Sequence, residues 1–402
     1  MAEEKVVGLL FHGPEVVDEG EAEEALAAVR SAGFEYEAVL GGITGKTAII
    51  DAGLQHIIDI SGDKKPSEVA LDFIERGIDF IILVNHSKNK ESAIALGRGI
   101  LRNVFKGLKD KRKFSFVQAE YAVRTFFKWI LSSKHEEAFR KLKDAFGFDD
   151  EDYSSAVADV AAFAERADVR GVVRREISGV LPNEKILVNG VVIGRVSAGN
   201  KSGKITLIAK NGRIVGVEGG TLIEHNLVKL PPLDLNAAVV KTGTHIRRTK
   251  PRRVGVESVS VKGEKKKVCL FYTVENLYPR LEKGDVAIVI TVGDDTTSIA
   301  GDILKRFEGI RLIGITDGDA DGLIKGIETG SIAEYSSFLP RKSVIIRLKP
   351  ERDDVVAEKV KREVLGGREE VAIEDIERDF ERLKRRILDL AREDVQSVLS
   401  SE

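Results

Sequence analysis

The chain has 402 residues, of which 43% are hydrophobic and 32% are charged, so it is long enough for two or three globular domains. Lys and Arg total 63 against 65 Asp and Glu, which excludes a global electrostatic attraction to nucleic acid or membranes and leaves only local patches to provide one. The single cysteine excludes an intramolecular disulfide, and no apolar run approaches the ~20 residues of a membrane span, so we expect a cytoplasmic protein that does not enter a membrane.

Residues 1–148 alternate short apolar runs with amphipathic stretches, which predicts an α/β domain. The apolar runs predict buried strands at 6–11, 35–40, 56–60, 78–84 and 114–118. The amphipathic stretches predict helices at 21–32, 65–77, 91–108 and 122–146. Since strands that alternate with helices favour βαβ units, we expect a mostly parallel sheet with helices on both faces, in a domain that binds a ligand.

An acidic stretch at 149–170 predicts a helical linker, after which the pattern changes to short strands. Asn-Gly pairs at 189–190 and 211–212 supply the positive backbone angles of tight hairpin turns. Residues 171–262, which end in a basic segment, are therefore predicted to form a small antiparallel barrel or sandwich.

Alternation returns in a second α/β domain at 263–352. Strands are predicted at 267–274, 285–292, 311–316 and 342–348, with helices at 296–308 and after Gly322. The tail at 353–402 is charged and predicted to be helical. Its apolar stripe favours a helix that packs on its own domain or on a second copy of the chain. The stripe consists of Ile373, Ile376, Phe380, Leu383, Ile387 and Leu390.

The loop GGITGKT at 41–47 follows a predicted strand and precedes a helix, where backbone N–H groups and a lysine can bind an anion. A phosphate loop of the G-x-x-x-x-G-K-[ST] type needs glycine at position 40, and Leu40 stands there. The alternative is that these glycines have only a structural role, as turn residues before a helix. The candidate anion-binding residues in the loop are Gly42, Thr44, Gly45, Lys46 and Thr47.

Two histidines, His12 and His86, fall at the ends of predicted strands, so they can face one anion-binding pocket at the edge of a parallel sheet. Glu15 and Asp63 are candidate partners that would orient them. The alternative is that each histidine has a structural role.

The densest run of positive charge lies between the β module and the second α/β domain. Phosphate groups of a nucleic acid or nucleotide are natural partners for such a run, although no aromatic residue is interleaved for base stacking. The alternative is a solvated linker paired with acidic surface. The residues that would steer a phosphate are Arg247, Arg248, Lys250, Arg252 and Arg253.

Three aspartates, Asp317, Asp319 and Asp321, alternate along a loop that follows an apolar run. Carboxylates at this spacing can converge on a hard cation such as Mg²⁺, with Mn²⁺ as a substitute. The same loop fits the calcium pattern D-x-D-x-D-G-x5-E as far as Glu328, but the run before it is a predicted strand where that pattern needs a helix, so Ca²⁺ is less favoured. The remaining alternative is a solvated acidic turn.

The stretch IGITDGDADGL resembles the acidic motif of Toprim domains, which occur in topoisomerases, primases and small nucleases. This resemblance covers roughly residues 284–349 and implies Mg²⁺ held by Asp317 and Asp319, with Asp321 nearby. The Toprim pattern carries a catalytic glutamate after the preceding strand, where this chain has Asp294 and Asp295, which are one methylene shorter.

The whole chain also resembles an uncharacterised archaeal protein family, through FHGPE and GGITGKTAIIDAGL near the start and GITDGDADG near the end. The high Glu, Lys and Arg content, with one Cys and one Met, is typical of proteins from hot environments. We therefore expect a three-domain α/β protein that acts as a Mg²⁺-dependent enzyme on a phosphodiester or nucleotide. The alternative is a non-catalytic ligand-binding or scaffold protein with a structural ion site and an anion-sensing N-terminal domain.

Overall fold

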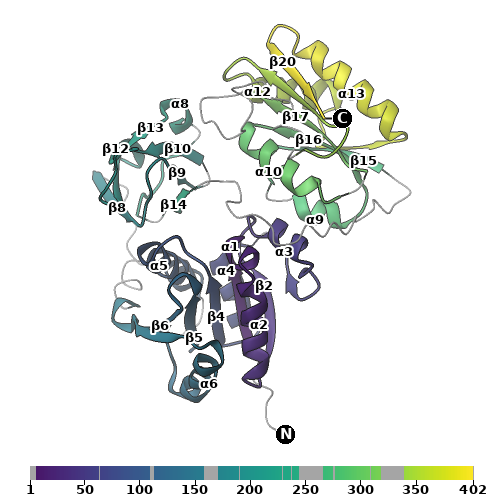
Figure 1. Ribbon diagram of the computed structural model, residues 1–402. Coiled ribbons are helices and arrows are strands. Elements are labelled where there is room, and N and C mark those ends of the chain that lie inside the picture. The colour runs from purple at the N-terminus through teal and green to yellow at the C-terminus, as the bar shows by residue number, and fades with distance from the viewer. Residues whose placement is uncertain are drawn as a thin grey trace. The chain divides into compact units, whose positions relative to one another are not determined.

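The protein forms two compact units, each of which is described by itself (Figure 1). Unit 1 comprises Met1–Ala48, His56–Asp59 and Lys64–Arg252, and unit 2 comprises Ile49–Gln55, Ile60–Asp63 and Arg253–Glu402. The computed structural model describes residues 6–62, 64–108, 113–157, 171–189, 191–228, 230–236, 238–243, 266–274, 277–307, 309–317 and 339–401.

The N-terminal domain of unit 1 is built on a seven-stranded sheet of order β3-β2-β1-β4-β5-β6-β7. The strands β3, β2, β1, β4 and β5 are parallel, as predicted, whereas β6 runs antiparallel to β5 and β7 parallel to β6. The strands are β1 (Val6–His12), β2 (Glu35–Leu40), β3 (Ile58–Asp59), β4 (Phe80–Asn85), β5 (Ser115–Glu120), β6 (Thr125–Ile130) and β7 (Asp149–Asp152).

Helices cover this sheet in two groups, with α4 packed on α5 and α2 packed on α6 (Figure 1). The first group forms one core with the sheet through residues such as Phe73, Ile100 and Phe116. The helices are α1 (Glu15–Asp18), α2 (Glu21–Ser31), α3 (Lys46–Ala52), α4 (Pro66–Glu75), α5 (Lys90–Gly107) and α6 (Glu136–Phe146), with short 3₁₀ turns η1 (Tyr121–Val123) and η2 (Ser133–His135).

Two predictions for this region were wrong. The stretch 122–146 is not one helix, because Thr125–Ile130 forms β6 and only Glu136–Phe146 is α-helical. The run TFFKWI is β-branched and aromatic, and its side chains are mostly buried, so it packs as a strand despite its helix-like periodicity. Asp149–Asp152, placed in the helical linker, extends the sheet as β7.

The β module of unit 1 is antiparallel, as predicted, with sheets β13-β10-β9-β14 and β12-β11-β8 around one apolar core. Both predicted hairpins form, since Val188 pairs with Val191 and Lys210 with Arg213 across two-residue turns. Asn189, Asn211 and Gly212 have the expected positive φ angles of 49°, 51° and 78°. The elements are β8 (Val172–Ser178), β9 (Lys185–Val188), β10 (Val191–Val196), β11 (Lys204–Lys210), β12 (Arg213–Glu218), β13 (Gly220–Leu222), α8 (Glu224–Leu227) and β14 (Val240–Gly243).

Unit 2 contains a six-stranded sheet of order β19-β15-β16-β17-β18-β20, whose four central strands are parallel. Within this unit, Asp51 is buried and accepts hydrogen bonds of 2.8 and 2.6 Å from the guanidinium of Arg306. The strands are β15 (Lys266–Phe271), β16 (Val286–Val292), β17 (Arg311–Thr316), β18 (Val344–Leu348), β19 (Glu370–Ile373) and β20 (Val395–Ser400). The helices are α9 (Leu277–Glu282), α10 (Asp294–Leu304), α12 (Asp353–Lys359), the π-helical η4 (Val360–Val364) and α13 (Ile376–Leu390).

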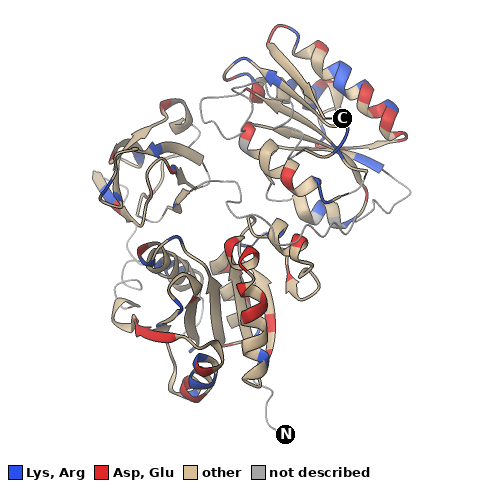
Figure 2. Ribbon diagram, in the orientation of Figure 1, with Lys and Arg blue, Asp and Glu red and all other residues tan. Residues whose placement is uncertain are grey.

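The C-terminal tail is not purely helical, because β19 and β20 add one antiparallel strand to each edge of the central sheet. The predicted apolar stripe belongs mainly to α13, whose Phe380, Leu383 and Ile387 are buried in the core of unit 2, while acidic and basic residues occupy most of its other positions (Figure 2). The stripe therefore packs on its own domain. None of the helices described here is long and apolar enough to cross a membrane.

Candidate functional site

The carboxyl edge of the N-terminal sheet, where its parallel strands end, is the best-defined candidate site. The strand order reverses beside β1, because the chain passes from β1 to β2 on one side and reaches β4 on the other. In doubly wound sheets this reversal, the topological switch point, opens a crevice in which ligands bind. The loops at 11–15, 41–47 and 85–92, which include the predicted His12, the GGITGKT stretch and His86, leave this edge.

A chain of buried hydrogen bonds leads to this edge and fixes the orientation of its amide side chains. It begins at Trp129, whose Nε1–H can only donate and bonds Gln118 Oε1 at 3.1 Å. Gln118 therefore presents its Nε2, which donates to Glu120 Oε2 at 3.0 Å. Glu120 also accepts from Ser87 N at 2.6 Å and from Asn85 Nδ2 at 2.8 Å. Because a carboxylate only accepts, Asn85 turns its carbonyl oxygen away from Glu120.

This series of hydrogen bonds ends at His12. Its Nδ1 lies 2.9 Å from Asn85 Oδ1, and since an amide oxygen can only accept, the imidazole proton is on Nδ1. The backbone pairs His12 with Asn85 and Asn85 with Glu120, so these residues form one row across β1, β4 and β5. In the neutral ring Nε2 keeps its lone pair, and no hydrogen-bonding partner for it lies among the described residues. We call His12, Asn85, Ser87 and Glu120 the switch-point site.

The protein holds His12 in its neutral form. Burial of the ring lowers its pKa to about 4, and the positive charge of Lys241, on β14 of the β module, acts in the same direction. Burial also raises the pKa of Glu120, although the hydrogen bonds from Ser87, Asn85 and Gln118 oppose that rise. The site therefore offers a neutral hydrogen-bond acceptor, backed by a carboxylate that is saturated with donors.

His86, the second predicted histidine, is held differently. Its Nδ1 lies 2.9 Å from Glu21 Oε1, and this hydrogen bond raises the pKa of the imidazole. The structure gives Asn85 as the partner of His12 and Glu21 as the partner of His86, and neither is the predicted Glu15. Asp63, the other predicted partner, lies outside the described residues.

The GGITGKT loop lies at the same edge, but some of its hydrogen-bond donors already bond to other groups of the protein. The N–H of Gly42 donates to Lys64 O at 2.9 Å, and the N–H of Lys46 donates to Ile43 O at 3.1 Å. The side chain of Lys46 is fully buried and engaged within the protein. A Cβ at Gly45 would lie 3.0 Å from the carbonyl oxygen of Gly13, so this glycine is needed for the close approach of the two loops.

The carboxyl edge of the C-terminal sheet brings together two of the predicted acidic residues. Val292 pairs with Ile315 in the parallel ladder, and Asp294 and Asp317 each lie two residues beyond this pair. Both aspartates are buried, at 8% and 7% exposure, and Asp317 accepts a hydrogen bond of 2.7 Å from the backbone N–H of Glu351. Asp294 also begins α10, where a carboxylate is favoured by the helix dipole.

The other predicted residues of this site cannot be located. Asp319, Asp321 and the basic residues Arg247, Arg248, Lys250, Arg252 and Arg253 lie outside the described residues, as does the side chain of Asp295. Within the part of the chain that is described, no cluster of three or more His, Cys, Asp or Glu residues is arranged to hold a metal ion.

The sequence analysis missed the residues that orient His12. Asn85, Gln118 and Glu120 are polar residues in strands whose positions are all buried. A buried polar group is costly unless it is hydrogen-bonded, so a polar residue inside an apolar run is the signal that could have identified them.

Comparison with known proteins gives matches that cover both sheet edges. Residues 9–368 match the model of a family described as "Uncharacterized protein conserved in archaea (DUF2117)". The chain belongs to this archaeal family. It is also 33% identical over 351 residues to Uncharacterized protein MJ0065 of Methanocaldococcus jannaschii, in an alignment that covers 87% of this chain and 89% of that relative. The family match runs from β1 to beyond η4 and so includes His12 and Asp317.

Proposed function

We propose that this member of the archaeal family binds a small anionic ligand at the switch-point site, with Nε2 of His12 accepting a hydrogen bond from the ligand. The observation that carries the proposal is the hydrogen-bond chain from Trp129 to His12, which fixes a neutral acceptor at the sheet edge where doubly wound folds bind ligands. The charge of Lys241 supports an anion as the ligand.

Binding is favoured over acid–base catalysis at this site. A general base is most effective when its pKa lies near the working pH, and in the free protein burial keeps the pKa of His12 at about 4. The ring is therefore a weak base at neutral pH but a well-oriented hydrogen-bond acceptor. This supports an anion-sensing role for the N-terminal domain.

The proposal is tested by thermal unfolding in the presence of nucleotides, sugar phosphates and hydroxydicarboxylates, which are anions that also carry a hydrogen-bond donor. At least one class should raise the melting temperature of the wild type and leave that of His12→Ala and Asn85→Ala unchanged, because a ligand that binds only the folded state stabilises it. His56→Gln is the matched control, since this exposed histidine precedes β3 at the amino edge of the same sheet. Equal shifts in the wild type and in His12→Ala would contradict the proposal.

A second candidate function, Mg²⁺-dependent chemistry on a phosphodiester or nucleotide, is favoured by the two buried carboxylates of unit 2. Asp294 and Asp317 occupy corresponding positions at neighbouring strand ends, and oxygen ligands of this kind fit a hard cation such as Mg²⁺ or Mn²⁺. When bound, the ion would polarise a phosphoryl oxygen. Asp319 and Asp321 would complete the ligands and the basic segment would steer the phosphate, as the Toprim resemblance implies.

This second candidate is tested by calorimetric titration of Mg²⁺, Mn²⁺ and Ca²⁺ into the wild type and into Asp317→Asn/Asp319→Asn. We expect saturable binding of Mg²⁺ or Mn²⁺ that the double variant loses and that the control Asp389→Asn, on the exposed face of α13, retains. Equal binding by the double variant would refute a metal site in this loop.

A further inference from the structure

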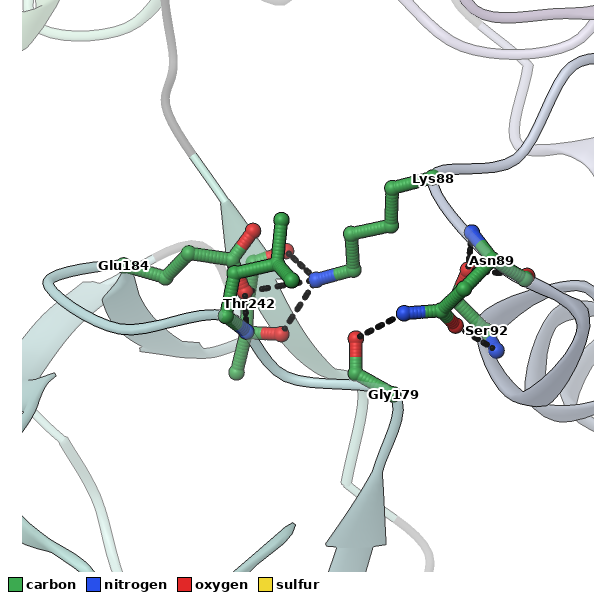
Figure 3. Close-up of polar contacts among 7 residues, drawn as sticks. Lys88, Asn89, Ser92, Gly179, Glu184 and Thr242 are labelled. Atoms are coloured by element: carbon green, nitrogen blue, oxygen red, sulfur yellow. Dashed lines mark hydrogen bonds and ion pairs between the residues drawn. The ribbon is translucent and has the colours of Figure 1, made fainter. Parts of the chain in front are cut away.

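A buried ion pair joins the β module to the loop that follows β4, next to the switch-point site. Lys88 follows β4, and its Nζ lies 2.6 Å from Glu184 Oε2, 3.0 Å from Thr242 Oγ1 and 3.3 Å from Thr242 O (Figure 3). The Glu184 side chain is only 3% exposed, so the positive charge of Lys88 stabilises its carboxylate, which also accepts a hydrogen bond of 2.9 Å from the backbone N–H of Leu181. This module contact, formed by Lys88, Glu184 and Thr242, holds β14 against the loop after β4, which carries Ser87.

A second set of contacts packs the β module closely against α5. Asn89, which caps α5, directs its Nδ2 to Gly179 O at 3.5 Å (Figure 3). A Cβ at Gly179 would lie 2.6 Å from the backbone nitrogen of Ser92. Farther along α5, Arg102 donates to Asn236 O at 2.8 Å. The β module is therefore positioned by several contacts within unit 1.

Lys241 directly precedes Thr242 in β14. The module contact therefore also fixes the backbone position from which the Lys241 side chain extends. The charge of Lys241 lowers the pKa of His12. The pKa of Lys241 is itself lowered, first by burial of its ammonium group and then by the charge of Lys65, from the loop at 61–67. Two like charges and a neutral histidine thus gather at one edge, an arrangement that an anion would stabilise.

We propose that Lys241 is a ligand-binding residue of the switch-point site, and that the ligand group is a monoprotonated phosphate. Its P–OH donates to Nε2 of His12, while its charged oxygens face the ammonium groups of Lys241 and Lys65. This inference rests on the proposed anion-binding function and adds to it the ligand class and a binding residue from the β module. A phosphate fits because it is anionic and, with a second pKa of about 6, is still protonated in part of its population near that pH, whereas a sulfate or carboxylate is only an acceptor.

The test is calorimetric titration at about pH 6, where phosphates still carry a proton. The probes are inorganic phosphate, glycerol phosphate as a monoester, and sulfate. The wild type should bind a phosphate saturably and sulfate at least about tenfold more weakly, as the loss of a hydrogen bond to a charged group predicts. The tighter of the two phosphate probes identifies whether the free anion or the monoester is preferred.

Variants separate this inference from the proposed function. Lys241→Gln should weaken phosphate binding about tenfold or more, while Lys241→Arg and the control Lys210→Gln, an exposed lysine of β11, keep it within about threefold. Unchanged binding by Lys241→Gln, or equal affinity for sulfate, would overturn the inference and leave the proposed function standing. A wild type that binds none of the anions tested, here or in the melting screen, would overturn both.

Discussion

The two parallel sheets of this protein carry opposite chemistry at their carboxyl edges. In the N-terminal domain the edge presents a neutral histidine, an amide and nearby lysines, with its carboxylate, Glu120, buried behind them and saturated with donors. In unit 2 the corresponding edge presents Asp294 and Asp317. One edge suits an anion and the other a cation, so the strand-end side chains determine the chemistry, not the architecture that the two sheets share.

The largest expected effect concerns the contact that holds the β module at the first edge. Lys88→Met should destabilise unit 1 by about 3 kcal/mol, because it removes the cation that pairs with the buried Glu184 carboxylate across the module contact. Urea unfolding followed by the fluorescence of Trp129, the single tryptophan, measures this loss. The exposed pair of Lys141 and Glu137 is the control, and Lys141→Met should cost no more than about 0.5 kcal/mol.

A second variant checks the origin of that loss. If it arises from an uncompensated carboxylate, Lys88→Met/Glu184→Leu should recover part of the stability. A double variant that is less stable than Lys88→Met would show that the contact stabilises the domain in another way.

Removing the carboxylate of Glu120 should have the next largest effect. Glu120→Gln should cost about 2 kcal/mol, because the new amide N–H₂ would face donors from Ser87, Asn85 and Gln118. The same urea assay measures it, with the exposed Glu137→Gln as the control. A stable Glu120→Gln protein would mean that the amide orientations along this edge are not fixed as described.

The two histidines predict opposite dependences of stability on pH. The folded-state pKa of His12 is lowered to about 4, so its contribution to stability is lost as pH falls from about 6.5 towards 4, by up to about 1.4 kcal/mol per pH unit. The pKa of His86 is raised by Glu21, so its contribution is present below about pH 6.5 and is lost as pH rises through its folded pKa.

Unfolding free energies measured across this range separate these two contributions. His12→Gln should flatten the loss of stability below pH 6.5, whereas His86→Gln should remove the loss that occurs as pH rises above 6.5 and leave the slope below pH 6.5 unchanged. Identical pH profiles for the two variants would contradict the assignment of their partners.

The smallest effect on stability is expected at the acidic edge. Asp317→Asn should change the free energy of unfolding in the absence of metal by less than about 1 kcal/mol, since the asparagine oxygen can still accept from the N–H of Glu351. Thermal unfolding with and without Mg²⁺, followed by circular dichroism, measures this. A large loss in the absence of metal would mark Asp317 as a structural residue.

Most strands and both hairpins could be predicted from local pattern, because buried strands and Asn-Gly turns have short-range causes. The errors arose where distant partners decide the outcome. The TFFKWI run has helix-like spacing and becomes a strand because β5 pairs with it, and the tail supplies β19 and β20 because the central sheet has two open edges.

Within the candidate site, too, local sequence predicted some residues, whereas others are brought together only by distant parts of the chain. His12 was predicted from its position at a strand end, but its partner Asn85 lies 73 positions away and meets it only through the register of β1 and β4. Lys241 lies just before the predicted basic run in the sequence, and its charge reaches His12 only because the β module docks on the loop after β4.

The central claim is that His12 is neutral, protonated on Nδ1 and ready to accept a hydrogen bond at Nε2. The most direct test is a long-range ¹H–¹⁵N correlation spectrum of histidine-labelled protein across pH, with His12→Gln assigning the signal. We predict the Nδ1–H tautomer, with titration near pH 4. An Nε2–H tautomer, or titration near the ordinary pKa of about 6.5, would contradict the assignment of His12 as the acceptor of this site.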